Sequence, residues 1–259
     1  MSYWQDRLSA TMDKITRKTT KQIEKQLAKY YRDTAKATIE EFRAVLDRVM
    51  VGQAEGISPT PADLYRLEKY WQMQGQLSAE LQKLGDKQIK TLQKAFENNY
   101  FEVYYSIYLG ENPTFNTVDT EAVQHVLNSI WCADGKTWSQ RIWDNTKRLK
   151  ETLNEGLVHC ITAGLNSNDL KHILQDRFNV SFGRADALVR TELAHIQTQA
   201  AEQRYKDYGV KRVQVWADED ERRCEVCGKL HETYHYIGEA LPIPAHTNCR
   251  CCIVPVIED

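Results

Sequence analysis

The sequence predicts a mainly α-helical protein with long N-terminal helices, a helical body, and a small α+β, cysteine-rich C-terminal subdomain. Three observations support this fold class. Glycine (12 residues) and proline (6 residues) are scarce among the 259 positions, so few sites favour turns. Apolar residues recur at three- and four-residue steps over most of the first 208 positions, which is the spacing of one helix face. Five of the seven cysteines lie between Cys224 and Cys252.

The first fifty residues are expected to form one long helix, because neither glycine nor proline occurs before Gly52. One stretch of this helix, from Thr11 to Arg32, contains seven basic and two acidic residues. Such a face is usually only solvated, and the alternative is contact with DNA or with an acidic partner. The candidate residues for that contact are Lys14, Arg17, Lys18, Lys21 and Lys25.

A linker is predicted at Val51–Pro61, which contains two glycines and two prolines. Thr60 followed by Pro61 predicts a new helix start, since a hydroxyl cap precedes a proline at the first helical position. This helix is expected to continue to about Leu109, and its aromatic stretch Tyr100–Tyr108 is expected to be a packed core seam. We therefore predict a long-helical region at residues 1–110 and a second region at residues 111–259.

Shorter helices are predicted in the second region, each opened by a small polar residue. Thr137, Ser167 and Ser181 are the expected starts, and Thr137 has the spacing of a capping box. The last of these helices is expected to end near Tyr208, because Gly209 suits a left-handed C-terminal position.

Strand character is confined to the tail of the second region, residues 210–259. Val210–Trp216 alternates apolar and polar residues, and Tyr234–Ile237 is the expected partner strand.

The tail also has the cysteine spacing of a zinc site. Cys224 and Cys227 form a Cys-x2-Cys knuckle, and His246 and Cys249 form a second pair 18 residues later. Three thiolates and one imidazole suit tetrahedral Zn²⁺, and four protein ligands favour a structural site over a catalytic one. Cys251 is an alternative to Cys249, and unpaired buried thiols or an oxidised pair of cysteines are the alternative to a metal.

Histidines between the two ligand pairs leave the fourth ligand open. His231 and His235 also complete an H-E-x-x-H string, which in zinc proteases lies on a helix. We interpret this match as accidental, because Thr233 and Tyr234 favour β-structure.

The acidic run Asp218–Glu221 is expected to be a solvated loop. An alternative function would use it: a metal-dependent DNA-processing enzyme, or nuclease, with Asp218, Asp220, Glu221 and His231 near the metal.

Composition restricts the class of protein. The formal charge of −2 and the isoelectric point near 6.4 argue against a basic coat for nucleic acid. Apolar runs are far shorter than the roughly 20 residues of a membrane span, and the first residues do not resemble a signal peptide. We therefore expect a soluble protein made in the cytosol, without a membrane partner.

Three segments of the second region together resemble a known family. Arg190-Thr191-Glu192 resembles the R-T-E signature of the Mu F-like head-morphogenesis family of phage minor head proteins. Asp220–Cys227 is similar to its D-x-R-T-C-x2-C motif, and Pro244–Cys251 to its P-x-H-x2-C-R-C motif. The segments occur in the family's order over Gly164–Pro255, about a third of the chain. From the residues alone, Arg190 and Glu192 are expected to form an ion-pair network fixing helix to tail.

The match departs from the family at two places. Arg223 stands where threonine is usual, and Leu230-His231-Glu232 replaces a common L-D-G turn.

The resemblance implies a non-enzymatic virion component inside the phage head, made in the host cytoplasm before assembly. It implies partners at the portal vertex, namely the portal protein and other head proteins. It also implies contact with packaged DNA during packaging or ejection.

Overall fold

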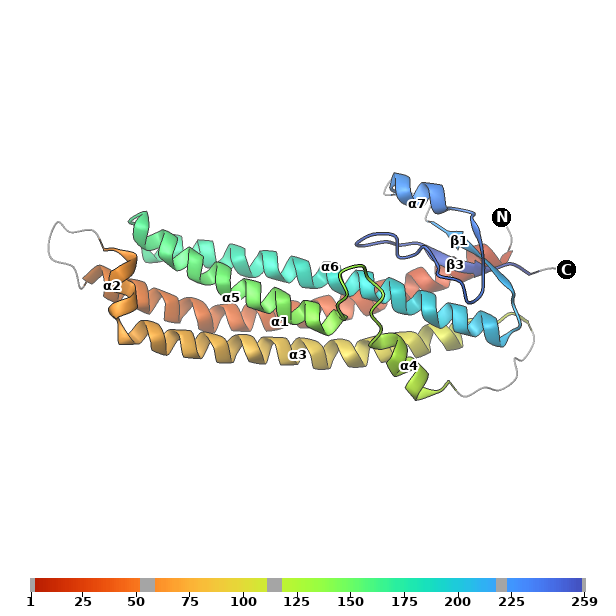
Figure 1. Ribbon diagram of the computed structural model, residues 1–259, viewed down its shortest axis with the longest axis horizontal. Coiled ribbons are helices and arrows are strands. Elements are labelled where there is room, and N and C mark those ends of the chain that lie inside the picture. The colour runs from red at the N-terminus through yellow and green to blue at the C-terminus, as the bar shows by residue number, and fades with distance from the viewer. Residues whose placement is uncertain (1–2, 52–58, 111–117, 218–222, 258–259) are drawn as a thin grey trace. The chain divides into compact units, whose positions relative to one another are not determined.

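The computed structural model describes residues 3–51, 59–110, 118–217 and 223–257 (Figure 1). The mainly α-helical class with a small C-terminal sheet is confirmed, and no described helix is long and apolar enough to cross a membrane. The elements are α1 (Tyr3–Val51), α2 (Pro61–Arg66), α3 (Glu68–Ser106), α4 (Thr120–Leu127), α5 (Trp138–Thr162), α6 (Ser167–Asp207), β1 (Arg212–Trp216), α7 (Glu225–Leu230), β2 (Tyr234–Tyr236) and β3 (Cys252–Pro255).

The chain forms two compact units, each assembled from separate stretches of sequence. Unit 1 comprises Met1–Glu24, Thr91–Trp138 and Ala187–Asp259, and unit 2 comprises Lys25–Lys90 and Ser139–Asp186. The expected division into residues 1–110 and 111–259 stays a prediction.

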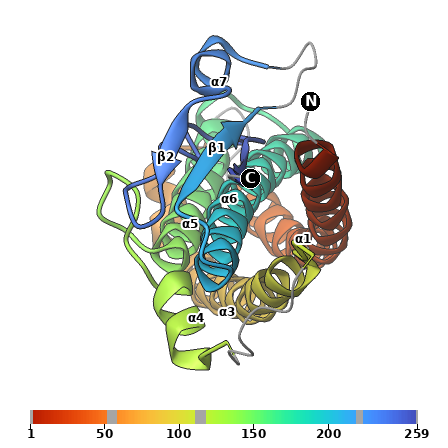
Figure 2. The same cartoon turned by 90° about the vertical axis from the view of Figure 1, so that its right-hand side faces the viewer.

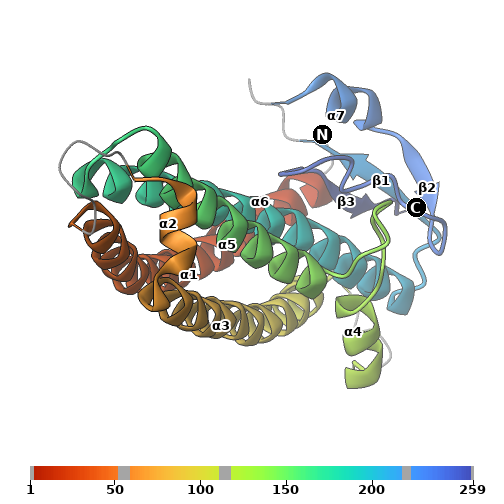
Figure 3. The same ribbon diagram turned by 60° about the vertical axis from the view of Figure 1, so that its left-hand side comes forward.

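Unit 2 is a bundle in which parts of α1, α3, α5 and α6 run alongside one another, and α2 lies where α1 and α3 are joined (Figure 3). Apolar side chains on the facing stripes of these helices form its core. Fully buried examples are Leu27, Phe42, Leu46, Leu64, Met73, Leu84 and Leu153.

A buried polar node joins the four long helices of unit 2. The Tyr31 hydroxyl donates to Gln88 Oε1 at 3.3 Å and lies 3.3 Å from Ser181 Oγ. Asn145 Nδ2 donates to the Tyr31 hydroxyl at 3.1 Å and to the Ser181 carbonyl at 2.8 Å. Burial raises the pKa of Tyr31 to about 12, so its hydroxyl keeps its proton at neutral pH.

This node explains why the predicted helix start at Ser181 is wrong. Ser181 lies in the interior of α6, which continues from Ser167 to Asp207. Its hydroxyl lies beside Tyr31 in the core, so it does not cap a helix end. A serine is compatible with a helix interior when its side chain has such a partner.

The helix expected to run from Thr60 to about Leu109 is interrupted at Leu67, whose extended backbone (φ −82°, ψ 122°) separates α2 from α3. Two other predicted helix boundaries agree with the structure. Thr60 and Asp63 form a reciprocal capping box at the start of α2, where Pro61 is the first helical residue. Gly209, at φ 76°, ends α6, and the amide of Val210 donates to the Tyr205 carbonyl at 3.0 Å. That bond is one of the two that define a Schellman motif.

Unit 1 contains the sheet, whose strand order is β2-β1-β3 with both pairs antiparallel (Figure 2). Both predicted strands are present. The third strand, β3, is absent from the prediction, because four residues ending in Pro255 give too short a pattern to recognise. Ile253 and Val254 of β3 are fully buried, and the Tyr205 hydroxyl donates to the Ile253 carbonyl at 3.1 Å, which anchors the sheet on α6.

The aromatic stretch near the end of α3 is only partly a core seam. Tyr100 and Tyr104 are buried in unit 1, whereas Tyr105 and Tyr108 are exposed. The helix itself ends at Ser106, three residues before the expected end.

The Tyr31 node predicts a measurable loss of stability in Tyr31→Phe. Removing the hydroxyl leaves Gln88 and Asn145 with fewer partners in the core, so the free energy of unfolding should fall by about 1–3 kcal/mol. Urea denaturation followed by circular dichroism measures it. Tyr65→Phe, which removes a half-exposed hydroxyl in the same unit, should change stability by less than about 0.5 kcal/mol. Equal stabilities for the two variants would contradict a structural role for the node.

Candidate functional site

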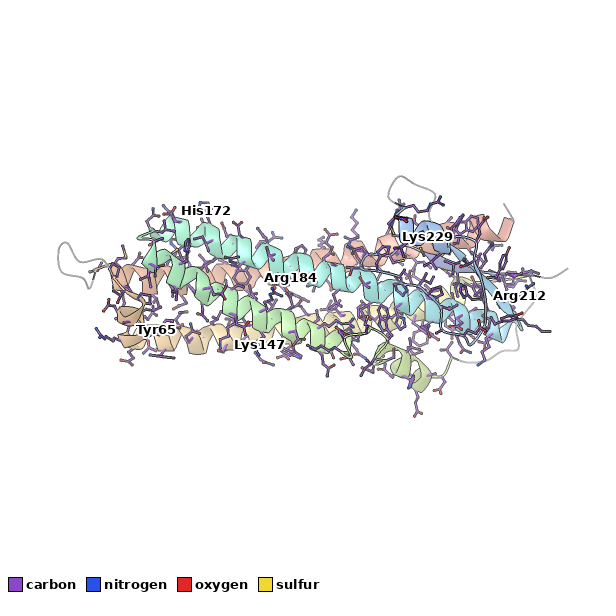
Figure 4. All side chains as sticks on the ribbon, turned by 45° about the horizontal axis from the view of Figure 1, so that its top comes forward. Tyr65, Lys147, His172, Arg184, Arg212 and Lys229 are labelled. Carbon is purple, nitrogen blue, oxygen red and sulfur yellow. The ribbon has the colours of Figure 1, made fainter. Side chains whose placement is uncertain are left out.

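The first ligand pair is positioned by the short helix α7. Cys224 is the N-cap of α7, and its sulfur accepts a hydrogen bond from the Cys227 amide at 3.4 Å. The cap directs both sulfurs toward the same side of the first turn. An ion pair between Lys229 and Glu225, 2.7 Å long and separated by one turn, supports the helix on its solvent side (Lys229 is labelled in Figure 4).

His246 completes a first cluster with this pair. Its Nε2 lies 3.2 Å from Cys224 Sγ and 3.0 Å from Cys227 Sγ. Its Nδ1 lies 2.8 Å from the Thr247 carbonyl, which can only accept, so Nδ1 carries the proton. The Nε2 lone pair therefore faces the two sulfurs, which is the tautomer that a metal ligand needs.

A second cluster shares Cys227 with the first. Its sulfur lies 3.9 Å from Cys249 Sγ, and Cys251 joins this pair to make a group of three buried thiols. Each cluster of three ligand atoms lies within 4.8 Å, close enough to hold a metal ion. The structure therefore brings together all four predicted ligands and the alternative Cys251. The choice between Cys249 and Cys251 stays a prediction.

The thiols in this cluster influence one another's ionisation. A hydrogen bond from Cys251 lowers the pKa of Cys249, and the same contact raises the pKa of Cys251. Burial raises the pKa of Cys227 to about 12. Several thiolates cannot ionise side by side in a partly buried site without a cation, and a bound metal removes that penalty.

The loop histidines lie outside both clusters. His231 Nδ1 accepts from the Ala217 amide at 3.2 Å, and its ring packs on Trp216 at 4.6 Å. His235 Nε2 lies 3.1 Å from the Thr233 hydroxyl in the sheet region. Between them, Glu232 has a left-handed φ of 62°. The H-E-x-x-H string therefore does not lie on a helix, so it lacks the element on which zinc proteases place this string.

Three consecutive residues of α6 contact three different parts of unit 1. Arg190 Nη2 lies 3.6 Å from Glu24 Oε2 on α1, the Thr191 hydroxyl accepts from the Asn248 amide at 3.1 Å, and Glu192 Oε2 accepts from Trp131 Nε1 at 2.9 Å. A contact from this triplet to the tail is made by Thr191. The ion-pair network that joins Arg190 and Glu192 to the tail stays a prediction. The sequence contains no pattern that would identify Trp131 as the partner of Glu192.

The comparisons with known proteins cover the same part of the chain. Residues 151–254 match the family model described as Phage Mu protein F like protein. This segment, less than half of the chain, is similar to that family. No curated protein and no solved structure matches the chain. The matched segment contains the R-T-E triplet of α6, β1, β2, most of β3 and every candidate metal ligand.

The predicted basic residues lie on α1 and are all exposed: Lys14, Arg17, Lys18, Lys21 and Lys25. Two of them already have acidic partners. Arg17 contacts Asp13 at 2.9 Å, and Lys18 contacts Glu102 of α3 at 2.7 Å. Their net contribution to a positive surface is therefore smaller than the sequence indicates. The acidic run Asp218–Glu221 lies outside the described residues.

One further buried group adjoins the R-T-E triplet of α6. The ring of His195 stacks on Trp131 with centroids 4.4 Å apart and planes 10° apart. Its Nε2 has no hydrogen-bond partner among the described residues. Burial lowers the pKa of His195 from 6.5 to about 4, because the cation would be desolvated.

This lowered pKa predicts a specific acid sensitivity. As pH falls, the unfolded chain takes up a proton at His195 before the folded protein does. The contribution of neutral His195 to the free energy of unfolding is therefore complete above pH 6.5 and is lost on acidification toward pH 4. His195→Phe keeps an aromatic ring against Trp131 but cannot titrate. Between pH 6.5 and pH 4.5, the free energy of unfolding of wild type should fall by up to about 1.4 kcal/mol per pH unit more than that of this variant. Denaturation at several pH values measures the difference, and parallel curves would contradict the assignment.

Proposed function

We propose that this protein is a minor head protein of a phage and acts in head morphogenesis at the portal vertex. The observation that carries the proposal is the Mu F-like match over residues 151–254, which coincides with the R-T-E helix and the cysteine-rich tail. Its location would be the interior of the virion head, after synthesis in the host cytoplasm. Its partners would be the portal protein and other head proteins.

The tail in this proposal holds one structural Zn²⁺. Cys224, Cys227 and His246 supply three ligands, and Cys249, with Cys251 as the alternative, supplies the fourth. Support comes from the two clusters joined at Cys227 and from the His246 tautomer. When bound, zinc would join α7 to the segment before β3 and so stabilise the folded tail.

The proposed role is not enzymatic. A zinc ion with four protein ligands has no open position for a substrate or an activated water. The nuclease alternative has no supporting observation among the described residues, because His231 packs on Trp216 away from both clusters. Asp218, Asp220 and Glu221 lie outside those residues.

Contact with packaged DNA is a further part of the proposal. Lys14, Lys21 and Lys25 are exposed at helical spacing on α1, and such a stripe attracts phosphates in a salt-dependent way. The acidic partners of Arg17 and Lys18 reduce this attraction, so we expect the contact to be weak and independent of base sequence.

Zinc content tests the metal site directly. Wild-type protein purified without added metal or chelator should contain close to one zinc per chain by elemental analysis. Cys227→Ser should lose the zinc and lower the melting temperature, because Cys227 belongs to both clusters. Cys132→Ser, which changes a half-buried thiol outside the clusters, should keep it. Wild-type protein that is folded, metal-free and has all its thiols free would exclude the site.

Co-purification tests the proposed place in the head. The protein and the portal subunit of the same phage, expressed in one cell with a tag on the portal alone, should elute as a complex at moderate salt. An untagged portal is the control for carry-over. Soluble, folded protein that forms no complex at any salt concentration would contradict a portal-vertex role.

A further inference from the structure

Unit 1 exposes aromatic rings of α3 next to lysines of α1. Residues three, four or seven positions apart lie on one side of a helix, and the lysines and rings of this surface follow that spacing. All of them belong to the same compact unit. We call this surface the lysine–aromatic face, and its residues are Lys14, Lys18 and Lys21 of α1 with Lys94, Phe101, Glu102 and Tyr105 of α3.

Two contacts between the helices fix how the two halves of this face meet. Lys18 Nζ donates to Glu102 Oε1 at 2.7 Å, and Asn99 Nδ2 donates to Thr19 Oγ1 at 3.3 Å. Within unit 1, α1 and α3 run in opposite directions (Figure 1). Lys14, one turn before Lys18, therefore lies beside the turn of α3 that follows Glu102.

That turn of α3 carries Tyr105, whose ring is 60% exposed and is held by two neighbouring rings. The Phe101 ring lies nearly parallel to it, with centroids 6.3 Å apart and planes 14° apart. The buried Tyr104 ring packs against it at nearly a right angle, with centroids 5.1 Å apart. An exposed ring that is already held can stack on another flat group with little further loss of rotamer freedom.

Positive charge predominates next to this ring. Four lysines and one glutamate give the lysine–aromatic face a charge of +3. Lys18 forms an ion pair with Glu102. Lys14, Lys21 and Lys94 are exposed and make no ion pair within the described part of the chain, so their charges are available to a ligand.

Two other carboxylates near the face are directed elsewhere. Glu97 accepts from Gln124 Nε2, so it lies on the side of α3 that faces α4. Asp13 forms an ion pair with Arg17 at 2.9 Å. The excess of positive charge beside Tyr105 therefore remains.

Aromatic rings next to lysines are typical of surfaces that bind single-stranded nucleic acid, where the cations follow the phosphates and the rings stack on bases. The bases of a duplex are already stacked on one another, so a duplex could use only the lysines. Protein interfaces also favour tyrosine and phenylalanine, but they are depleted in lysine. The three exposed lysines therefore favour a nucleic acid over a protein partner.

We propose that the lysine–aromatic face binds unpaired nucleotides of DNA, with a base stacked on Tyr105 and the neighbouring phosphates against the three exposed lysines. This binding rests on the DNA contact that forms part of the function proposed above, and it gives that contact a preference for single strands over duplexes. A ring can stack on every base, so the binding is independent of base sequence.

Fluorescence anisotropy tests the preference with a labelled oligothymidylate of about 12 nucleotides and a labelled duplex of the same length. The duplex carries about twice the charge, so the lysines alone would favour it. Wild type should instead bind the oligothymidylate more tightly. Tyr105→Ala should weaken that binding about tenfold and leave the affinity for the duplex unchanged, because the variant removes a ring and no charge.

Two control variants isolate the contribution of the ring. Tyr105→Phe keeps the ring without its hydroxyl and should bind the oligothymidylate within about twofold of wild type. Tyr234→Ala is the matched control, because Tyr234 is 58% exposed in the same unit but lies on β2. It should also stay within about twofold of wild type, and thermal melts establish that all three variants remain folded.

Five results would overturn the inference. They are no binding of the oligothymidylate by wild type, tighter binding of the duplex by wild type, equal losses in Tyr105→Ala and Tyr234→Ala, tighter binding of an oligouridylate, and tighter binding of a labelled glutamate–alanine peptide that Tyr105→Ala loses. The fourth result would identify RNA as the ligand, and the fifth an acidic protein segment.

The duplex separates this inference from the DNA contact proposed above. Duplex binding that Lys14→Glu/Lys94→Glu weakens, without any effect of Tyr105→Ala on either ligand, contradicts stacking and leaves the DNA contact standing. Lys171→Glu/Lys211→Glu is the control for total charge, since it changes two exposed lysines outside the face. Absence of binding to both ligands at low salt contradicts stacking and the DNA contact together, and the portal complex still tests the head-protein function.

Discussion

The contacts of Arg190, Thr191 and Glu192 hold together the parts of unit 1 that carry the candidate sites. Successive residues of a helix point about 100° apart, so a triplet can reach three different neighbours. On α6 these neighbours are α1, the cysteine-rich tail and the segment around Trp131. Glu192 is 3% exposed, and a buried carboxylate is tolerable only with a hydrogen-bond donor such as the Trp131 indole. The triplet is therefore best understood as a structural junction.

Much of the fold was predictable because its helix ends carry local signals. Thr60 with Asp63 and the left-handed Gly209 act through contacts within a few residues. Ser181 was misread as such a signal, since its partner Tyr31 is 150 residues away. For the same reason the Trp131–Glu192 contact could not be foreseen. Cysteine spacing predicted candidate ligands that lie close together in the structure, but it cannot choose between Cys249 and Cys251, whose sulfurs lie in one cluster.

The central proposal is that this protein, whose residues 151–254 are similar to the Mu F-like family, is a component of the phage head. Quantitative mass spectrometry of purified, DNA-filled heads, from the phage that encodes the chain, tests it most directly. The account predicts peptides from both units at a small and constant number of copies relative to the portal subunit. Heads that lack the protein, while infected cells contain it in soluble form, would contradict the account.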